Sequence, residues 1–187
     1  MRRLTPLFML ALAACADGAT SPTEMPNLAR IQEAEDSHGG TPFMAVLLPG
    51  TEVPIPPGGD PNPAAGGVAF VTLNSGQEEI CVDVSFGNLS APLSDSHIHF
   101  APEGVRGGIV VPFQPAGEPA LPKATSGEFA RCVFASRELI KAIRDNPQDY
   151  YVNIHTRSTP ANPLTDRPGG AIRGQLQPVQ GSEVNQS

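Results

Sequence analysis

Short stretches of alternating apolar and polar residues recur along most of the chain, and each ends near a glycine, proline or asparagine. Alternation of this kind places one apolar row on one face of a β-strand, and the punctuating residues are those of turns. Eight stretches are legible, at residues 42–50, 66–74, 78–89, 96–100, 107–113, 127–134, 150–156 and 170–179. About eight short strands predict an all-β domain, either a Greek-key β-sandwich or a barrel.

One segment departs from this alternation. In "SRELIKAIRDNP" the apolar residues Leu139, Ile140 and Ile143 fall on one face of a helix. Ser136 precedes the segment as a capping residue, and Pro147 ends it. We expect one short helix that packs over an end or a face of the sheet.

The stretch "SHIHF" places His97 and His99 on the same side of a strand, because side chains alternate. Ile98 and Phe100 lie on the other side and, being apolar, should face the core. The stretch "YYVNIHT" repeats the arrangement, so His155 should also lie on an outer face.

Two imidazoles about 7 Å apart at Cα on one strand can converge on a single ion, and His155 would supply a third ligand. Neutral imidazoles suit copper, zinc, nickel or iron better than calcium or magnesium. Asp95 and Glu103 are candidates for orienting the rings. The alternative is that these histidines are surface residues or a cross-strand hydrogen-bonding set without a metal.

The N-terminus resembles an export signal. Arg2 and Arg3 precede an apolar run that is too short to span a bilayer. The run ends in "LAAC", which resembles the lipobox of bacterial lipoproteins and makes Cys15 the lipidated residue; the alternative is an ordinary signal peptide with a chance cysteine. Residues 1–15 are thus predicted to be a lipoprotein signal peptide and residues 16–41, which include His38, a flexible tether. The protein is expected in the cell envelope, lipid-anchored at the outer membrane, in the periplasm or on the cell surface.

The charge and the motifs of the chain bear on which partners it can bind. The formal net charge is −7, and the chain loses two positive charges with Arg2 and Arg3, so nucleic acid is excluded as a favoured partner. No catalytic triad, P-loop or dinucleotide fingerprint is present. The membrane, reached through the lipid anchor, is the one partner that the sequence predicts; no protein partner follows from it.

Cys81 and Cys132 remain once Cys15 is assigned to the anchor. Two cysteines on strand-like segments in an oxidising compartment favour a Cys81–Cys132 disulfide. A thiolate metal ligand or a catalytic cysteine is the alternative.

Five segments in order, "AVLLPGTEVPIPP", "GGVAFVTLN", "SHIHFAPEGVRGGIVVPF", "NPQDYYVNIHT" and "RPGGAIRGQL", resemble the CHRD domain, first named from chordin. The resemblance covers about residues 42 to 178. It implies an extracellular β-sandwich, with a domain at 42–179 and a disordered tail at 180–187. On this basis the chain is an extracytoplasmic binding module.

The strand series is also similar to the Cu/Zn superoxide dismutase family, in "GNLSAPLSDSHIHF", "NIHT" and "TDRPGGAIRG". This similarity implies a superoxide dismutase-like fold and matches His97, His99 and His155 to copper ligands. Arg167 would match the arginine that guides superoxide, with Arg173 as its competitor. The zinc loop and the bridging histidine of that family have no counterpart here. The alternative function is therefore a superoxide dismutase-like oxidoreductase with a single metal ion, copper first, with iron or zinc as the other candidates.

Overall fold

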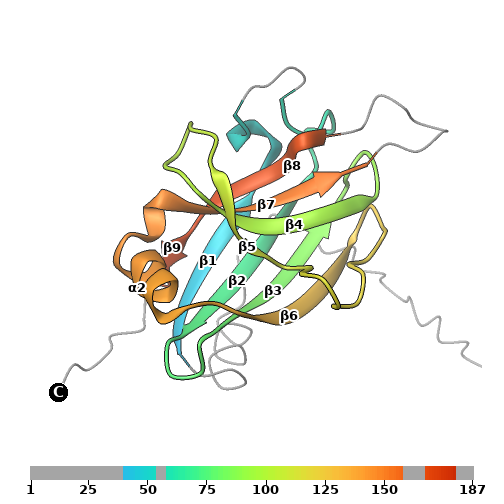
Figure 1. The fold of residues 1–187 in the computed structure, drawn as a ribbon. Helices are drawn as coiled ribbons and strands as arrows, with labels where there is room; N and C mark the ends of the chain where they lie inside the picture. The colour runs from blue at the N-terminus through green and yellow to red at the C-terminus, as the bar shows by residue number, and fades with distance from the viewer. Residues whose placement is uncertain (1–39, 54–57, 158–166, 180–187) are drawn as a thin grey trace, which may run out of the picture.

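A computed structural model describes residues 40–53, 58–157 and 167–179, with the backbone alone at 167–169. Two antiparallel sheets face each other (Figure 1). The five-stranded sheet has the order β6 (Gly127–Phe134), β3 (Glu79–Gly87), β2 (Gly66–Asn74), β1 (Thr41–Leu47) and β9 (Gln177–Pro178). The four-stranded sheet has the order β5 (Gly108–Pro112), β4 (Leu93–Phe100), β7 (Tyr150–Thr156) and β8 (Arg167–Gln175). The fold of the described residues is a β-sandwich and not a closed barrel.

The core lies between the two sheets and follows from the alternation of the strands. Val71 and Val84 of the larger sheet and Ile98, Val152 and Ile172 of the smaller sheet are all fully buried. Their neighbours in sequence point to the opposite faces, as the period of two requires. The prediction of an all-β sandwich with about eight strands is confirmed, and the described residues form nine strands because a two-residue strand ends the last segment.

The predicted helix is present as α2 (Arg137–Asp145), at one end of the sandwich (Figure 1). The Ser136 hydroxyl accepts a hydrogen bond from the amide of Leu139 at 3.3 Å, which satisfies one of the free donors of the first turn. Ile140 and Ile143 are buried against the core. Two short 3-10 turns, η1 (Pro49–Thr51) and η2 (Pro147–Asp149), complete the described helical elements. None of the described helices is long and apolar enough to cross a membrane.

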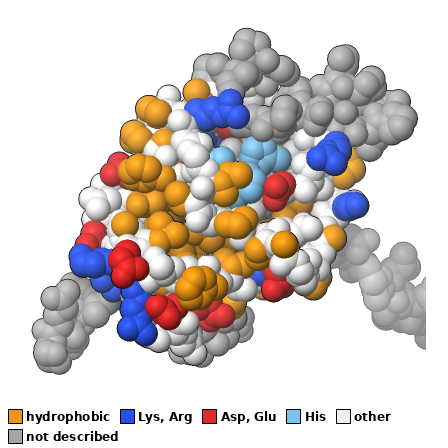
Figure 2. Space-filling model, viewed as in Figure 1, with side chains coloured by type: hydrophobic (Ala, Val, Ile, Leu, Met, Phe, Trp, Pro, Cys, Tyr) orange, Lys and Arg blue, Asp and Glu red, His pale blue; other side chains and the backbone are white. Residues whose placement is uncertain are grey.

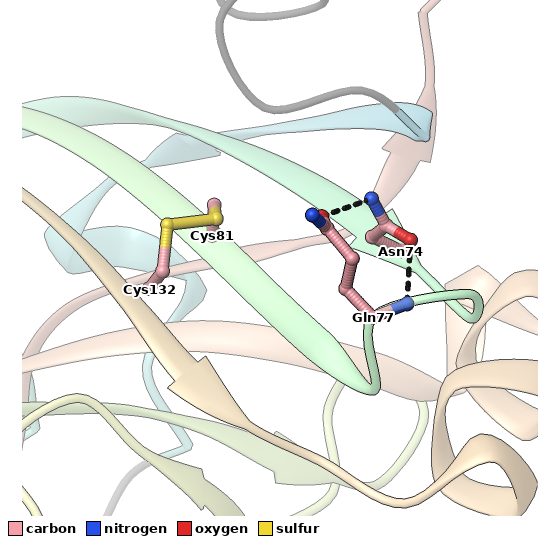
Figure 3. The surroundings of a disulfide bond; sticks show 4 residues. All are labelled: Asn74, Gln77, Cys81 and Cys132. Carbon is pink, nitrogen blue, oxygen red and sulfur yellow. Dashed lines mark hydrogen bonds between the residues drawn. A yellow bond between two sulfur atoms is a disulfide. The ribbon is translucent and has the colours of Figure 1, made fainter.

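Cys81 and Cys132 form the predicted disulfide (Figure 3). The two residues are directly opposite each other in the pairing of β3 with β6. A turn held by hydrogen bonds between Asn74 and Gln77 leads from β2 into β3 nearby. Both sulfurs are in the bond, so neither cysteine is a thiolate ligand or a nucleophile.

Phe100 differs from its prediction. It is the last residue of β4 and is 53% exposed, whereas the alternation places it in the core. Its ring lies beside Tyr150, with 5.1 Å between the ring centroids. The strand ends at Phe100, so only part of the ring is covered by core neighbours.

The predicted signal peptide, Cys15, most of the tether and the C-terminal tail lie outside the described residues.

Candidate metal site

Polar side chains form a continuous grid on the outer face of the four-stranded sheet. The pairing of β4 with β7 sets three pairs of residues opposite each other: Asp95 with His155, His97 with Asn153, and His99 with Tyr151. The pairing of β7 with β8 extends the rows from Asn153 to Arg173 and from Tyr151 to Gln175. Antiparallel pairing places such opposed side chains about 5 Å apart at Cβ, so the grid is a set of contacting groups.

His97, His99 and His155 come together on this face as predicted. Their candidate ligand nitrogens all lie within 4.8 Å of one another. The ring centroids of His97 and His155 are 4.6 Å apart, and those of His99 and His155 are 6.1 Å apart. His97 and His99 are nevertheless buried, with exposed fractions of 4% and 7%. His155 is half-buried, and histidine atoms reach the surface beside a hydrophobic and an acidic side chain (Figure 2).

The β4–β5 loop, residues 101–107, covers this face. Arg173 donates to the carbonyl oxygens of Val105 and Pro102 at 2.8 and 2.9 Å. Gln175 donates to the carbonyl of Ala101 at 3.1 Å, and the amide of Gly107 donates to the Tyr151 hydroxyl at 3.2 Å. The loop is therefore held to the sheet by side chains of β7 and β8, and it contacts the His99 ring through the carbonyl of Gly107.

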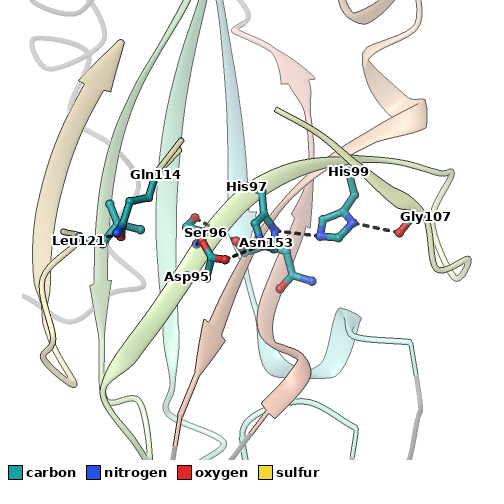
Figure 4. A network of polar contacts seen from close by, with 8 residues as sticks. All are labelled: Asp95, Ser96, His97, His99, Gly107, Gln114, Leu121 and Asn153. Carbon is teal, nitrogen blue, oxygen red and sulfur yellow. Dashed lines mark hydrogen bonds and ion pairs between the residues drawn. The ribbon is translucent and has the colours of Figure 1, made fainter. Parts of the chain in front are cut away.

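The hydrogen bonds of two histidines determine which ring nitrogens carry protons (Figure 4). Nδ1 of His99 lies 3.0 Å from the carbonyl oxygen of Gly107, which can only accept, so Nδ1 is protonated and Nε2 keeps its lone pair. Nε2 of His97 lies 3.3 Å from the Asp95 carboxylate, so this nitrogen donates and Nδ1 keeps its lone pair. The Asp95 carboxylate is itself fixed, because it accepts a hydrogen bond from the amide of Ser96 at 2.8 Å.

Nδ1 of His97 and Nε2 of His99 are 3.0 Å apart, which is hydrogen-bond distance, and the donor in this contact depends on the tautomer of His97. With the proton of His97 on Nε2 toward Asp95, both nitrogens of the contact carry lone pairs, and a cation between them, either a proton or a metal ion, makes the contact favourable. Two nitrogens on one ion at 2.0–2.1 Å are separated by about 2.9–3.4 Å for bond angles near 90–110°, so the spacing is that of a ligand pair.

Burial keeps these imidazoles neutral. Desolvation, and next the neighbouring His155, lower the pKa of His97 from 6.5 to about 4, against the opposing effect of Asp95. Desolvation also lowers the pKa of His99, against its hydrogen bond to Gly107. Neutral imidazole is the form that binds metals, so the two rings are in their ligand form at neutral pH.

The rings of His99 and Tyr151 are stacked, with their centroids 4.7 Å apart and their planes 2° from parallel. The Arg173 guanidinium lies over the same Tyr151 ring, 3.4 Å from the ring centroid. Arg173 is 1% exposed and donates hydrogen bonds to two backbone carbonyls of the β4–β5 loop and to Gln175, so its guanidinium holds the loop to the sheet. The side chain of Arg167, the predicted guide, lies outside the described part; its backbone begins β8 opposite Thr156.

Glu52 is a buried carboxyl group at the edge of the grid. It follows η1, is 9% exposed, and lies with the Asn153 amide against the backbone of Gly170, which has a φ of 121°. Desolvation raises the pKa of Glu52 from 4.5 to about 8, although Arg173 acts in the opposite direction. Glu52 is therefore mainly protonated at pH 7.

The sequence analysis identified Asp95 as a partner of the rings, and the structure shows this contact. Glu103 is instead exposed on the β4–β5 loop. Tyr151, Gly107 and Glu52 were missed as parts of the site, and Arg173 was considered there only as a competitor of Arg167. For Tyr151 a signal existed, since it shares the outer face of its strand with His155.

Residues 43–176 match the family model of the CHRD domain. No curated protein and no solved structure matches the chain. The match covers more than half of the chain and includes all three clustered histidines. The similarity to superoxide dismutases remains a prediction.

Proposed function

The chain belongs to the CHRD domain family, and from this premise we propose that it is an extracytoplasmic binding module that holds one transition-metal ion through His97, His99 and His155. CHRD domains are typically extracellular, which agrees with the export signal predicted at residues 1–15. We further propose that Cys15 carries the lipid that anchors the domain in the cell envelope.

One observation supports the metal site above all others. Nδ1 of His97 and Nε2 of His99 lie 3.0 Å apart, while Asp95 and the carbonyl oxygen of Gly107 contact the other nitrogen of each ring. Partners that orient ligand rings in this way are a regular feature of metal sites in proteins. The candidate nitrogens lie up to 4.8 Å apart, so binding requires the set to contract, and we expect His155, the least buried of the three, to move most.

The ligand set limits the choice of metal. Three neutral imidazoles favour copper, and after it iron or zinc, over calcium and magnesium, which require oxygen ligands.

The test is metal content by mass spectrometry, on the soluble chain that begins after Cys15 and is loaded with copper and desalted. The wild type is compared with a His97→Ala/His155→Ala double variant and with His38→Ala, which removes the histidine of the predicted tether. We expect about one copper per chain in the wild type and in His38→Ala, and a trace in the double variant. Equal trace metal in all three would refute the metal site.

A second candidate function is superoxide dismutation, and the partial exposure of His155 favours it. A small anion can approach a bound ion from the surface at which histidine atoms are visible (Figure 2). The reaction passes one electron from one superoxide to another with uptake of two protons, giving dioxygen and hydrogen peroxide. Arg167 would guide the anion. A superoxide assay on the copper-loaded wild type and on Arg167→Ala tests this candidate: no activity above that of free copper would refute it.

A further inference from the structure

A buried positive charge lies one aromatic ring away from the candidate metal site. Arg173 is 1% exposed, its guanidinium is 3.4 Å from the centroid of the Tyr151 ring, and that ring is stacked on His99. Arginine keeps its charge at all physiological pH values, so this charge is permanent.

The charge has no carboxylate partner in the described part of the chain. The hydrogen bonds of Arg173 go to the carbonyls of Pro102 and Val105 and to the side-chain oxygen of Gln175, all of which are neutral. Two described carboxyl groups act on it at longer range, Glu52 and Glu103. Glu52 is mainly protonated at pH 7, and Glu103 is exposed, so solvent screens its effect.

The ligands do not compensate this charge either. Three neutral imidazoles bring no negative charge to a bound ion. Among the described residues, Asp95 is the one carboxylate that contacts a ligand ring, and its side chain is 51% exposed. In a site of low dielectric constant, a nearby fixed cation penalises each further unit of positive charge, so a divalent ion is penalised more than a monovalent one.

We propose that the site takes copper as the monovalent ion, Cu(I), and that Arg173 is the positioning residue that biases it against Cu(II) and Zn(II), acting across Tyr151 and His99. This inference rests on the proposed three-histidine metal site and adds to it the charge of the ion that the site prefers. Cu(I) accepts three-coordinate nitrogen ligation, whereas Zn²⁺ normally requires a fourth ligand.

The experiment compares affinities for Cu(I), Cu(II) and Zn(II) in the wild type, Arg173→Met and Arg173→Lys. Cu(I) is measured anaerobically against a chromogenic chelator, and the divalent ions against competing chelators. Arg173→Met removes the charge, and Arg173→Lys retains a charge but loses the fork that holds the β4–β5 loop. We expect the ratio of Cu(I) to Cu(II) affinity to fall about tenfold or more in Arg173→Met and to change much less in Arg173→Lys.

A further variant covers the case in which Arg173→Met does not fold. Gln175→Glu places a carboxylate against the same guanidinium, where the Gln175 oxygen now accepts at 2.9 Å from Nη2 of Arg173. This change neutralises the charge while the arginine stays in place, and should lower the ratio in the same direction.

The outcomes separate the two proposals. An unchanged ratio in both charge-removing variants, or an equal fall in Arg173→Lys and Arg173→Met, would overturn the role of Arg173 while the metal site stands. A wild type that prefers Zn(II) or Cu(II) to Cu(I) would overturn the preference itself. A wild type that binds none of the three ions would overturn the metal site and this inference together.

Discussion

Replacing Glu52 by glutamine should make the protein more stable at neutral pH. The Glu52 carboxyl is 9% exposed, and burial raises its pKa from 4.5 to about 8. A raised folded-state pKa means that the folded protein binds this proton more tightly than the unfolded chain does. The stability that Glu52 contributes is therefore complete below pH 4.5 and is lost as the pH rises to about 8. Glutamine has nearly the same shape and is neutral throughout.

The size of the effect follows from the width of this pH interval. For each pH unit between the two pKa values, the free energy of unfolding falls by about 1.4 kcal/mol. Between pH 4.5 and pH 7 the wild type therefore loses about 3 kcal/mol of stability, whereas Glu52→Gln, which does not ionise, loses none of it. We expect the two proteins to be equally stable to within about 1 kcal/mol at pH 4, and the variant to be more stable by about 3 kcal/mol at pH 7.

Urea unfolding at pH values from 4 to 8, with the disulfide intact, measures this difference. All other titrating groups are common to both proteins, so the difference between the two curves isolates Glu52. A constant difference across the range would show that Glu52 has the same pKa in the folded and the unfolded protein, and would rule out the raised pKa.

Three further predictions concern the same site and its scaffold. Gly170→Ala should cost about 1–3 kcal/mol in urea unfolding, since at a φ of 121° its Cβ would lie closer than 3.0 Å to the ends of the buried Glu52 and Asn153 side chains, which would have to shift. Gly104→Ala, with a φ of 74° and no atom within 4 Å of the new Cβ, should cost less, about 1 kcal/mol; an equal cost at both positions would contradict this. Reduction of Cys81–Cys132 removes the cross-link that restricts the unfolded chain, so it should lower the free energy of unfolding by about 4 kcal/mol. This is measured as a lower urea midpoint in the presence of reductant; an unchanged midpoint would contradict it. The stability that His97 contributes should be lost as the pH drops from 6.5 to 4, because its depressed pKa lets the unfolded chain take up the proton first. This loss opposes the gain from Glu52, so it is measured as the difference in urea unfolding between the wild type and His97→Gln, which should shrink across this range; a constant difference would contradict it.

The faces of the strands could be predicted from the sequence. The period of two alone places His97 and His99 together and His155 on the outer face of its own strand. That the two strands are neighbours could not be derived from the alternation, because Asp95 and His155 are paired across sixty residues of chain. Here the family resemblance supplied what local pattern lacks.

The cover over the site could not be predicted. A period of two distinguishes an apolar face from a polar one, but it does not reveal that a loop lies over the polar face. Arg173 has the pattern of an exposed residue, yet it is buried, because its guanidinium donates four hydrogen bonds to carbonyl oxygens of the β4–β5 loop and to Gln175. For Phe100 the error has the opposite sign: the alternation predicts burial, but the residue is exposed because the end of a strand lacks the neighbours that bury its centre.

X-ray absorption at the copper edge of the loaded protein reports the ligands of the bound ion itself. We expect about three nitrogen ligands near 2.0 Å with the scattering signature of imidazole, and loss of that signature in His97→Ala/His155→Ala. A first shell of oxygens, or the same spectrum in both proteins, would contradict the three-histidine site.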